Sequence, residues 1–186
     1  GIHPDFITVD GTEGGTGAAP VELSNSVGMP FQQGLWFVNN ALRGVGFRDR
    51  VRVVAAGKIV TGFHLFRAVA LGADLCNSAR PMMFALGCIQ ARQCNTNTCP
   101  VGVATQNPAQ TVGLVPADKG PRVARYQAAT VKAFLEMVAA AGLEDPCDIR
   151  PFHVDRRVAG PDVQSFAKLY PWMPDGFLMD ESVIPK

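Results

Sequence analysis

The sequence has few charged residues and almost no excess of either sign. Asp, Glu, Lys and Arg make up 18% of the 186 residues, and the formal net charge is +1, whereas soluble domains average about 25% charged residues. Proteins that bind nucleic acid carry a clear basic excess, so this balance argues against a nucleic-acid partner. Because the chain is 47% hydrophobic, we expect other segments or partners to cover much of its surface, and disorder is excluded.

Long apolar runs and a secretory leader are also missing. The longest apolar run, over residues 81–89, is about half of the roughly 18 residues that a membrane span requires. The first residues contain no initiator Met, no basic segment and no apolar segment of a signal peptide. We therefore expect no membrane span, and the abrupt start on a strand pattern is consistent with a partial chain.

Three β-type runs, each followed by small or polar residues, alternate with two helical patterns. The runs cover residues 6–10, 51–56 and 73–77. Apolar residues at helical spacing predict helices over residues 31–45 and 62–71. This alternation is typical of parallel βα units.

The rest of the chain is predicted to be mainly helix and loop. Thr61 is the expected N-cap of the second helix. The residues of that helix expected to face inward are Phe63, Phe66, Val69 and Ala70. A further helix is expected from Pro81, and a long one over residues 122–141 after a loop over residues 95–121. The Pro- and aromatic-rich tail from residue 146 is expected to be an arm that lies across another surface.

Three βα units cannot close a barrel, and a three-stranded parallel sheet has two exposed edges that proteins normally cover. We therefore interpret the chain as a piece of a larger α/β fold, either a (β/α)₈ barrel or a doubly wound sheet. The alternative is a small self-contained three-stranded α/β domain. The remainder of the barrel, or further copies of the chain, would then cover the open edges.

The cysteines of the sequence are odd in number, and three of them crowd together. Cys88, Cys94 and Cys99 follow the spacing C-x5-C-x4-C and precede a proline. Zinc fingers prefer C-x2–4-C pairs and four ligands, and no fourth Cys or His lies nearby. Three thiolates suffice for a three-iron cluster, whose cysteines come in compact runs. The spacing therefore favours an iron–sulfur centre in a reducing, cytoplasmic compartment, with free or buried thiols as the alternative.

Small residues follow the second and third predicted strands. Gly57 and Lys58 come after the second strand, and Ser78, Ala79 and Arg80 come after the third. Such turns offer backbone N–H groups and a guanidinium to an anion, and the loops after the last two strands of (β/α)₈ barrels commonly bind phosphate. If these are those two strands, a phosphorylated cofactor fits; otherwise they are tight turns with nothing bound.

The glycine-rich segment over residues 10–20 is too long for a tight turn. It has neither the G-x-G-x-x-G order of a dinucleotide fingerprint nor the lysine of a P-loop. Its glycines allow close approach of the backbone to a ligand. Thr12, Glu13 and Thr16 are the polar candidates for substrate contact. The alternative is a flexible loop with solvated side chains.

Four segments together resemble the synthase domain of glutamate synthase. They cover residues 11–18, 57–62, 70–74 and 85–106, the last of which contains the cysteine run and its trailing Pro-Val-Gly. The chain is most similar to the shorter FMN-binding glutamate synthase family proteins, which have this domain without a glutaminase part. Larger members have an acidic residue and two glycines where this chain has Ala-Gly-Lys over residues 56–58, and this difference favours the shorter branch.

The resemblance implies an FMN-bearing (β/α)₈ TIM barrel with a [3Fe–4S] cluster beside the flavin. The chain would supply its C-terminal part, about three βα units with the cluster loop over residues 1–115, and a helix and extended tail over residues 116–186. The family pattern matches the three cysteines, Gly57 and the segment 78–80; with Lys58 and the candidates of the glycine-rich segment, the expected site residues fall into three groups. They are Cys88, Cys94 and Cys99 for the cluster; Gly57, Lys58, Ser78, Ala79 and Arg80 for FMN; and Thr12, Glu13, Gly14, Gly15 and Thr16 for the substrate.

The reaction implied by the resemblance is reductive amination of 2-oxoglutarate with ammonia to give L-glutamate. Reduced FMN would supply the hydride, and the cluster would relay electrons from a ferredoxin or a reductase subunit. Two other functions stay open at this point. One is a truncated, non-catalytic iron–sulfur electron-transfer module, and the other is a zinc-stapled α/β binding domain.

Overall fold

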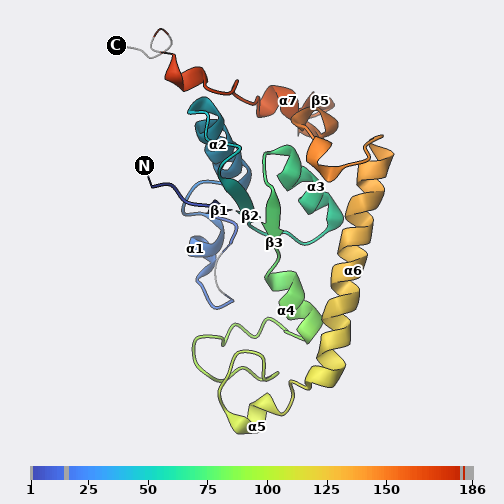
Figure 1. The fold of residues 1–186 in the computed structure, drawn as a ribbon. Coiled ribbons are helices and arrows are strands. Elements are labelled where there is room, and N and C mark those ends of the chain that lie inside the picture. Colours follow the sequence, from blue (N-terminus) through green and yellow to red (C-terminus); the bar gives the residue numbers. More distant parts are fainter. Residues whose placement is uncertain (1, 15–16, 181, 183–186) are drawn as a thin grey trace.

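A three-stranded parallel sheet lies at the centre of the computed structural model, which describes residues 2–14, 17–180 and 182 (Figure 1). Its strands are β1 (Phe6–Asp10), β2 (Arg52–Ala56) and β3 (Leu75–Asn77), in the order β1-β2-β3. Phe6 pairs with Arg52 and Asp10 with Ala56, so the carboxyl ends of β1 and β2 lie at the same edge. The parallel sheet of an α/β fold is therefore confirmed.

Helices connect the strands and extend beyond them. They are α1 (Val21–Asn25), α2 (Phe31–Gly44), α3 (Gly62–Ala70), α4 (Arg80–Leu86), α5 (Pro108–Thr111), α6 (Pro116–Ala140) and α7 (Phe166–Leu169). The tail adds a hairpin of β4 (Asp155–Ala159) and β5 (Asp162–Ser165) and three short 3₁₀ turns, at Pro146–Asp148, Pro151–His153 and Phe177–Met179. Among the described residues, no helix combines the length and the hydropathy needed to span a membrane.

The core lies on one face of the sheet. Val9, Val53 and Ala55 point from the strands into a buried cluster that also contains Leu35 of α2 and Phe66 of α3. Alternate residues of the strands face the other way, and there Phe6 is 61% and Leu75 is 60% exposed. Parallel sheets are normally covered on both faces. On this second face Val54 of the central strand is buried, at 8% exposed, but the described residues leave Phe6 and Leu75 uncovered. They also leave the outer edges of β1 and β3 without a partner strand.

The third strand is shorter than expected because a side chain replaces part of the ladder. The Asp74 carboxylate accepts a hydrogen bond from Val53 N–H at 2.7 Å, so β3 begins only at Leu75. Gly72 ends α3 with a positive φ of 106°, a conformation that favours glycine. The first strand matches the predicted residues, and the second begins one residue later than predicted.

Helix α3 confirms its predicted N-cap and corrects one predicted core residue. The Thr61 hydroxyl accepts a hydrogen bond from His64 N–H. Phe63, expected to face inward, is 45% exposed. The reason is the approach of α6: a Cβ placed on Gly62 would lie 2.5 Å from Phe134 N, so the tight helix–helix contact is at Gly62 and Phe63 points away from it.

Helix α6 begins earlier than predicted. The loop expected over residues 95–121 contains α5 and the first turns of α6, which starts at Pro116 and continues through Pro121. Because proline is favoured in a first helical turn but not inside a helix, the sequence pattern predicted that the helix starts after Pro121. The loop is therefore confirmed only up to the start of α5.

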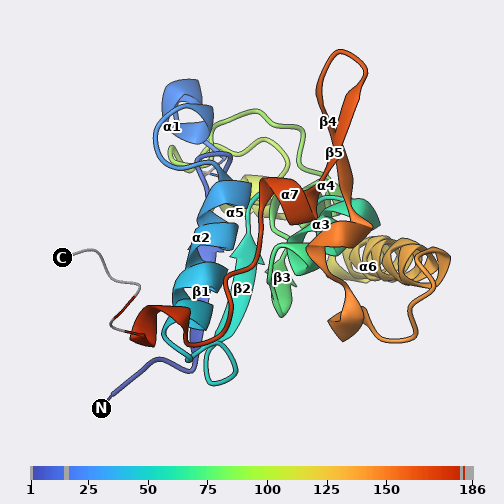
Figure 2. The same cartoon turned by 90° about the horizontal axis from the view of Figure 1, so that it is seen from above.

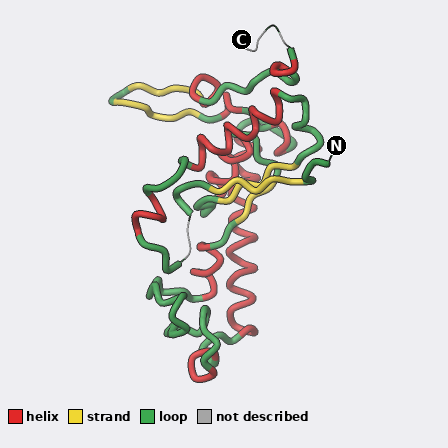
Figure 3. Tube along the Cα trace, turned by 90° about the vertical axis from the view of Figure 1, so that its left-hand side faces the viewer, coloured by secondary structure: helices red, strands yellow, loops and turns green. Residues whose placement is uncertain are grey.

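The predicted arm lies across α2 of the same chain (Figure 2). Trp36 Nε1 and Asn40 Nδ2 both donate to Pro171 O, at 2.8 and 2.9 Å. Arg43 donates to Met173 O at 2.7 Å, and it pairs with Asp175 at 2.9 Å. The hairpin of β4 and β5, which the sequence analysis did not predict, projects away from the rest of the molecule (Figure 3).

Candidate functional site

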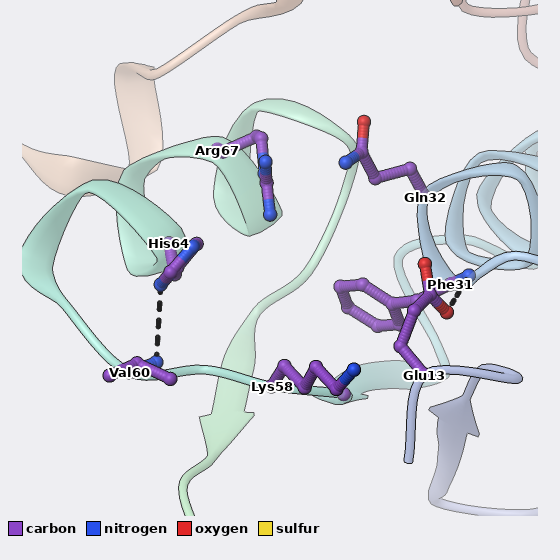
Figure 4. A pocket seen from close by; sticks show the side chains of 8 residues that line it. Glu13, Phe31, Gln32, Lys58, Val60, His64 and Arg67 are labelled. Atoms are coloured by element: carbon purple, nitrogen blue, oxygen red, sulfur yellow. Dashed lines mark hydrogen bonds between the residues drawn. The ribbon is translucent and has the colours of Figure 1, made fainter. Parts of the chain in front are cut away.

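Two cavities lie near the segments that leave the carboxyl ends of the strands. The larger, of about 240 Å³, lies among the segment after β1, the first turn of α2, the segment after β2 and helix α3 (Figure 4). The smaller, of about 30 Å³, lies between the cysteine segment and the glycine-rich segment. Parallel strands bring segments that are distant in the sequence to one edge, which is where α/β proteins bind ligands.

Thr12 and Glu13, both predicted to contact substrate, hold the glycine-rich segment in place. Thr12 Oγ1 donates to Val27 O at 2.9 Å. Glu13 Oε2 accepts from Phe31 N–H at 2.7 Å, at the start of α2. A Cβ on Gly14 would lie 2.7 Å from Asp10 Oδ1, so the turn excludes a side chain there. The predicted contacts at residues 15 and 16 lie outside the described residues.

The residues predicted to bind the FMN phosphate fall into two places. Gly57 and Lys58 line the larger cavity, and Lys58 Nζ donates to Asn25 Oδ1 at 2.7 Å. Ser78 Oγ donates to Ile59 O at 2.8 Å, which joins the two turns. Arg80 lines the smaller cavity instead. The turns after β2 and β3 are therefore neighbours, but their charged side chains point to different cavities.

Cys88, Cys94 and Cys99 all line the smaller cavity. Cys99 is buried and Cys94 is exposed. Among the described residues, no three Cys, His, Asp or Glu side chains are grouped closely enough to hold a metal ion. The three thiols thus share a cavity without converging on one point.

The surroundings of Cys99 nevertheless suit a thiolate ligand. Burial raises the pKa of its thiol, but hydrogen bonds from the backbone N–H groups of residues 101–104 outweigh burial and lower the pKa overall. Cys88 Sγ also accepts a backbone hydrogen bond, from Gln90 N–H at 3.4 Å. N–H groups directed at sulfur are the partners that iron–sulfur clusters have in proteins, so the donor set fits such a cluster in its chemistry.

The cysteine segment and the glycine-rich segment contact each other directly. Arg92 donates to Ala19 O at 2.7 Å. A Cβ on Gly17 would lie 2.7 Å from Cys94 Sγ, so only glycine leaves room for the thiol. Gln90 and Arg92 adopt positive φ values of 55° and 56°, which non-glycine residues rarely adopt. Such strain persists where the surrounding structure enforces it, and it is concentrated at functional sites.

Sequence reasoning missed several residues of the larger cavity. Phe31 and Gln32 come from the first turn of α2, and His64 and Arg67 come from α3. His64 Nδ1 accepts from Val60 N–H and Thr61 N–H at 3.3 and 3.2 Å. The sequence did contain one signal for His64. It lies three residues after the N-cap Thr61, the spacing at which the two residues can cap each other's backbone N–H groups. Arg67 lies one turn further along the same helix.

Burial is the main cause of the pKa shifts of the ionisable side chains that line the larger cavity. Burial and the neighbouring Arg67 charge lower the pKa of His64. Burial and the charge of Arg156 lower the pKa of Arg67, against smaller opposing contributions from Tyr170 and Glu13. A pKa of His64 below its ordinary value means that the imidazole is neutral at pH 7. With Nδ1 accepting two backbone hydrogen bonds, its proton resides on Nε2.

Comparison with known proteins places these segments in one family. The family described as the conserved region in glutamate synthase matches residues 1–144, which contain both cavities. The chain belongs to the glutamate synthase family. The match includes the glycine-rich segment, the turns after β2 and β3, and the cysteine segment.

Individual glutamate synthases show the same relationship. The chain is 44% identical over 154 residues to the glutamate synthase large subunit-like protein YerD of Bacillus subtilis, covering 83% of this chain and 29% of that protein. It is 37% identical over 139 residues to the archaeal glutamate synthase [NADPH] of Methanocaldococcus jannaschii, covering 75% and 27%. It is 42% identical over 104 residues to the chloroplastic ferredoxin-dependent glutamate synthase 2 of Arabidopsis thaliana, covering 56% and 6%. The chain therefore spans less than a third of the length of each relative.

Proposed function

We propose that this chain is the cofactor-binding end of a glutamate synthase-type oxidoreductase, which forms L-glutamate from 2-oxoglutarate and ammonia. The observation that carries the proposal is the smaller cavity. Cys88, Cys94 and Cys99 line it together with Gly17 of the glycine-rich segment and Arg80 of the turn after β3. The three segments assigned to the cluster, the substrate and FMN therefore meet at one place, as electron transfer between a cluster and a flavin requires.

The proposed fold is the C-terminal part of a (β/α)₈ barrel. The uncovered sheet face and the open edges of β1 and β3 support it, because further strands would cover both. In this proposal, residues 1–115 belong to the barrel and its cluster loop. Residues 116–186 form an extension, which begins with α6 at Pro116.

Particular residues of the chain would hold the two cofactors. Cys88, Cys94 and Cys99 would ligate a [3Fe–4S] cluster, with the N–H groups of residues 101–104 stabilising the Cys99 thiolate. The backbone at Gly57 and the segment 78–80 would bind the FMN phosphate, with Lys58 beside it. When bound, these groups supply hydride and single-electron chemistry. The protein's own part is to hold the glycine-rich segment against the cluster loop through Arg92 and Ala19.

The electron donor is proposed from the relatives. One relative is named as ferredoxin-dependent and others as NADPH enzymes, so we propose a ferredoxin or an NADPH-oxidising reductase subunit as the partner. All five cysteines are free thiols, which supports a reducing compartment such as the cytoplasm.

Anaerobic analysis of iron, acid-labile sulfide and flavin in the full-length protein tests the proposal. We expect all three, with iron and sulfide lost in Cys94→Ser and retained in Cys147→Ser, an exposed cysteine outside the cluster segment. Iron and sulfide without flavin would instead favour the electron-transfer module. Zinc without sulfide would favour the zinc-stapled domain, and neither cluster nor flavin would overturn the proposal.

A further inference from the structure

The larger cavity contains a cationic group that has no hydrogen-bond or ion-pair partner among the described residues. Arg67 lines it from α3 (Figure 4). Its guanidinium forms no hydrogen bond or ion pair with another described residue; its close contact is the ring of Phe63, at 5.8 Å. A partly buried guanidinium that has lost water without gaining an acceptor is costly, and its lowered pKa reflects that cost. An anion in the cavity would offset it.

Other groups of the wall add donors and positive charge. Lys58 lines the cavity, and the Nε2–H of His64 is left to donate because Nδ1 is occupied by two backbone N–H groups. Gln32 Oε1 is buried without a hydrogen-bond partner among the described residues. A hydrogen phosphate, or a carboxylate with one bound water, offers acceptors to Arg67 and an O–H donor to Gln32.

The carboxylate of the wall does not cancel this charge. Glu13 Oε2 accepts from Phe31 N–H at 2.7 Å, so part of its charge is offset by the positive N-terminal end of α2. The opposite charges of Glu13 and Arg67 are not within ion-pair distance. With Lys58 and Arg67 positive and His64 neutral, the described wall keeps an excess of positive charge.

We propose that this cavity binds a small oxyanion, either a phosphate or a carboxylate, at Arg67 and His64, beside the proposed position of the FMN phosphate rather than at it. Its volume of about 240 Å³ lies below the ~300–1,000 Å³ of sites for drug-sized ligands, so the ligand is small. Gly57 and Lys58 line the cavity and also belong to the FMN assignment, so the two sites adjoin there. Ser78 and Arg80, which the FMN assignment also requires, do not line it, and Arg67 and His64, which anchor the anion, play no part in that assignment.

Titration of the full-length, FMN-loaded protein with inorganic phosphate, followed by ³¹P NMR line broadening, tests the site; ¹³C-labelled acetate is the second probe. We expect saturable binding of at least one probe, and the tighter of the two identifies the source of the oxyanion. Arg67→Met should weaken binding at least about tenfold, because it removes a charge-assisted hydrogen bond. Arg67→Lys keeps the charge and should weaken it less. Arg125→Met, an exposed position on α6, is the matched control and should bind as the unaltered protein does.

Three results would overturn the proposal: no saturable binding of either probe, equal affinity in Arg67→Met, or binding in flavin-free protein that disappears when FMN is loaded. The last result would assign the cavity to the phosphate of FMN. If Arg67→Met fails to fold, Arg67→Lys and the FMN competition still decide the question. The titration reads the line width of the added probe, whereas the test of the proposed function reads iron, sulfide and flavin contents, so failure of one is distinguishable from failure of the other.

Discussion

Replacement of Arg48 by methionine should destabilise the end of the sheet opposite the cavities. Arg48 joins three segments there. Its Nε donates to Asn39 Oδ1 at 2.9 Å, and its Nη2 donates to Gly72 O at 2.9 Å. The same Nη2 lies 3.0 Å from Asp74 Oδ2, and that carboxylate also accepts from Val53 N–H. One guanidinium therefore connects α2, the end of α3 and the start of β3.

The magnitude follows from what the substitution leaves unpaired. Asn39 is only 1% exposed, and a buried acceptor without a donor costs about 1–3 kcal/mol. The ion pair with Asp74 is partly exposed, with side chains 13% and 24% accessible, and it contributes about 1 kcal/mol. We therefore expect Arg48→Met to lower the free energy of unfolding by about 2–4 kcal/mol, a large share of the ~5–15 kcal/mol typical of a domain.

Urea unfolding of the full-length protein, followed by tryptophan fluorescence, measures this loss. Arg52→Met is the matched control, because Arg52 is 64% exposed and lies 3.7 Å from the other oxygen of Asp74. We expect the control to change the free energy of unfolding by less than about 1 kcal/mol. Equal losses in the two variants would refute the reasoning, since burial of the network would then have no effect.

Three further substitutions test the site and the tail. Gly17→Ala should lower the iron content of the full-length protein, because the added Cβ would lie 2.7 Å from Cys94 Sγ. Gly120→Ala is the control and should not lower it, because no atom lies within 4 Å of the added Cβ. Equal iron contents in the two variants would contradict the contact. Arg80→Ala should reduce FMN retention and leave iron unchanged, because a guanidinium suits phosphate; undiminished FMN would remove Arg80 from the site. Asn40→Ala breaks two hydrogen bonds to the tail and should speed cleavage of residues 171–176 in limited proteolysis, and an unchanged rate would mean that the tail is held elsewhere.

The alternation of elements could be predicted because its signals are local. Strand β1 and helices α2 and α3 follow from apolar periodicity and capping residues. The predictions of a core residue and of a strand boundary were wrong where residues distant in the sequence make the deciding contact. Phe63 is exposed because α6 approaches Gly62, and β3 begins late because the Asp74 side chain takes a backbone partner.

The candidate site divides in the same way. The spacing of Cys88, Cys94 and Cys99 marks a site along one segment, so the sequence alone could single it out. Arg67 carries no such signal, because its importance depends on the cavity that it lines together with Phe31 and Glu13, and these residues come together only in the folded chain. The sequence could single out Glu13 as a polar residue of the glycine-rich segment, but it could not predict the hydrogen bond that Glu13 accepts from Phe31 N–H at the start of α2.

The sequence by itself determined the order of the elements, the cysteine run and the glycine-rich turns, because each depends on neighbours a few residues apart. Only the tertiary structure decided that Gly17 lies against Cys94, and that Lys58 and Arg80, both predicted to bind FMN, line different cavities. The physical reason is the parallel register of β1, β2 and β3, which brings segments far apart in the chain to one edge of the sheet.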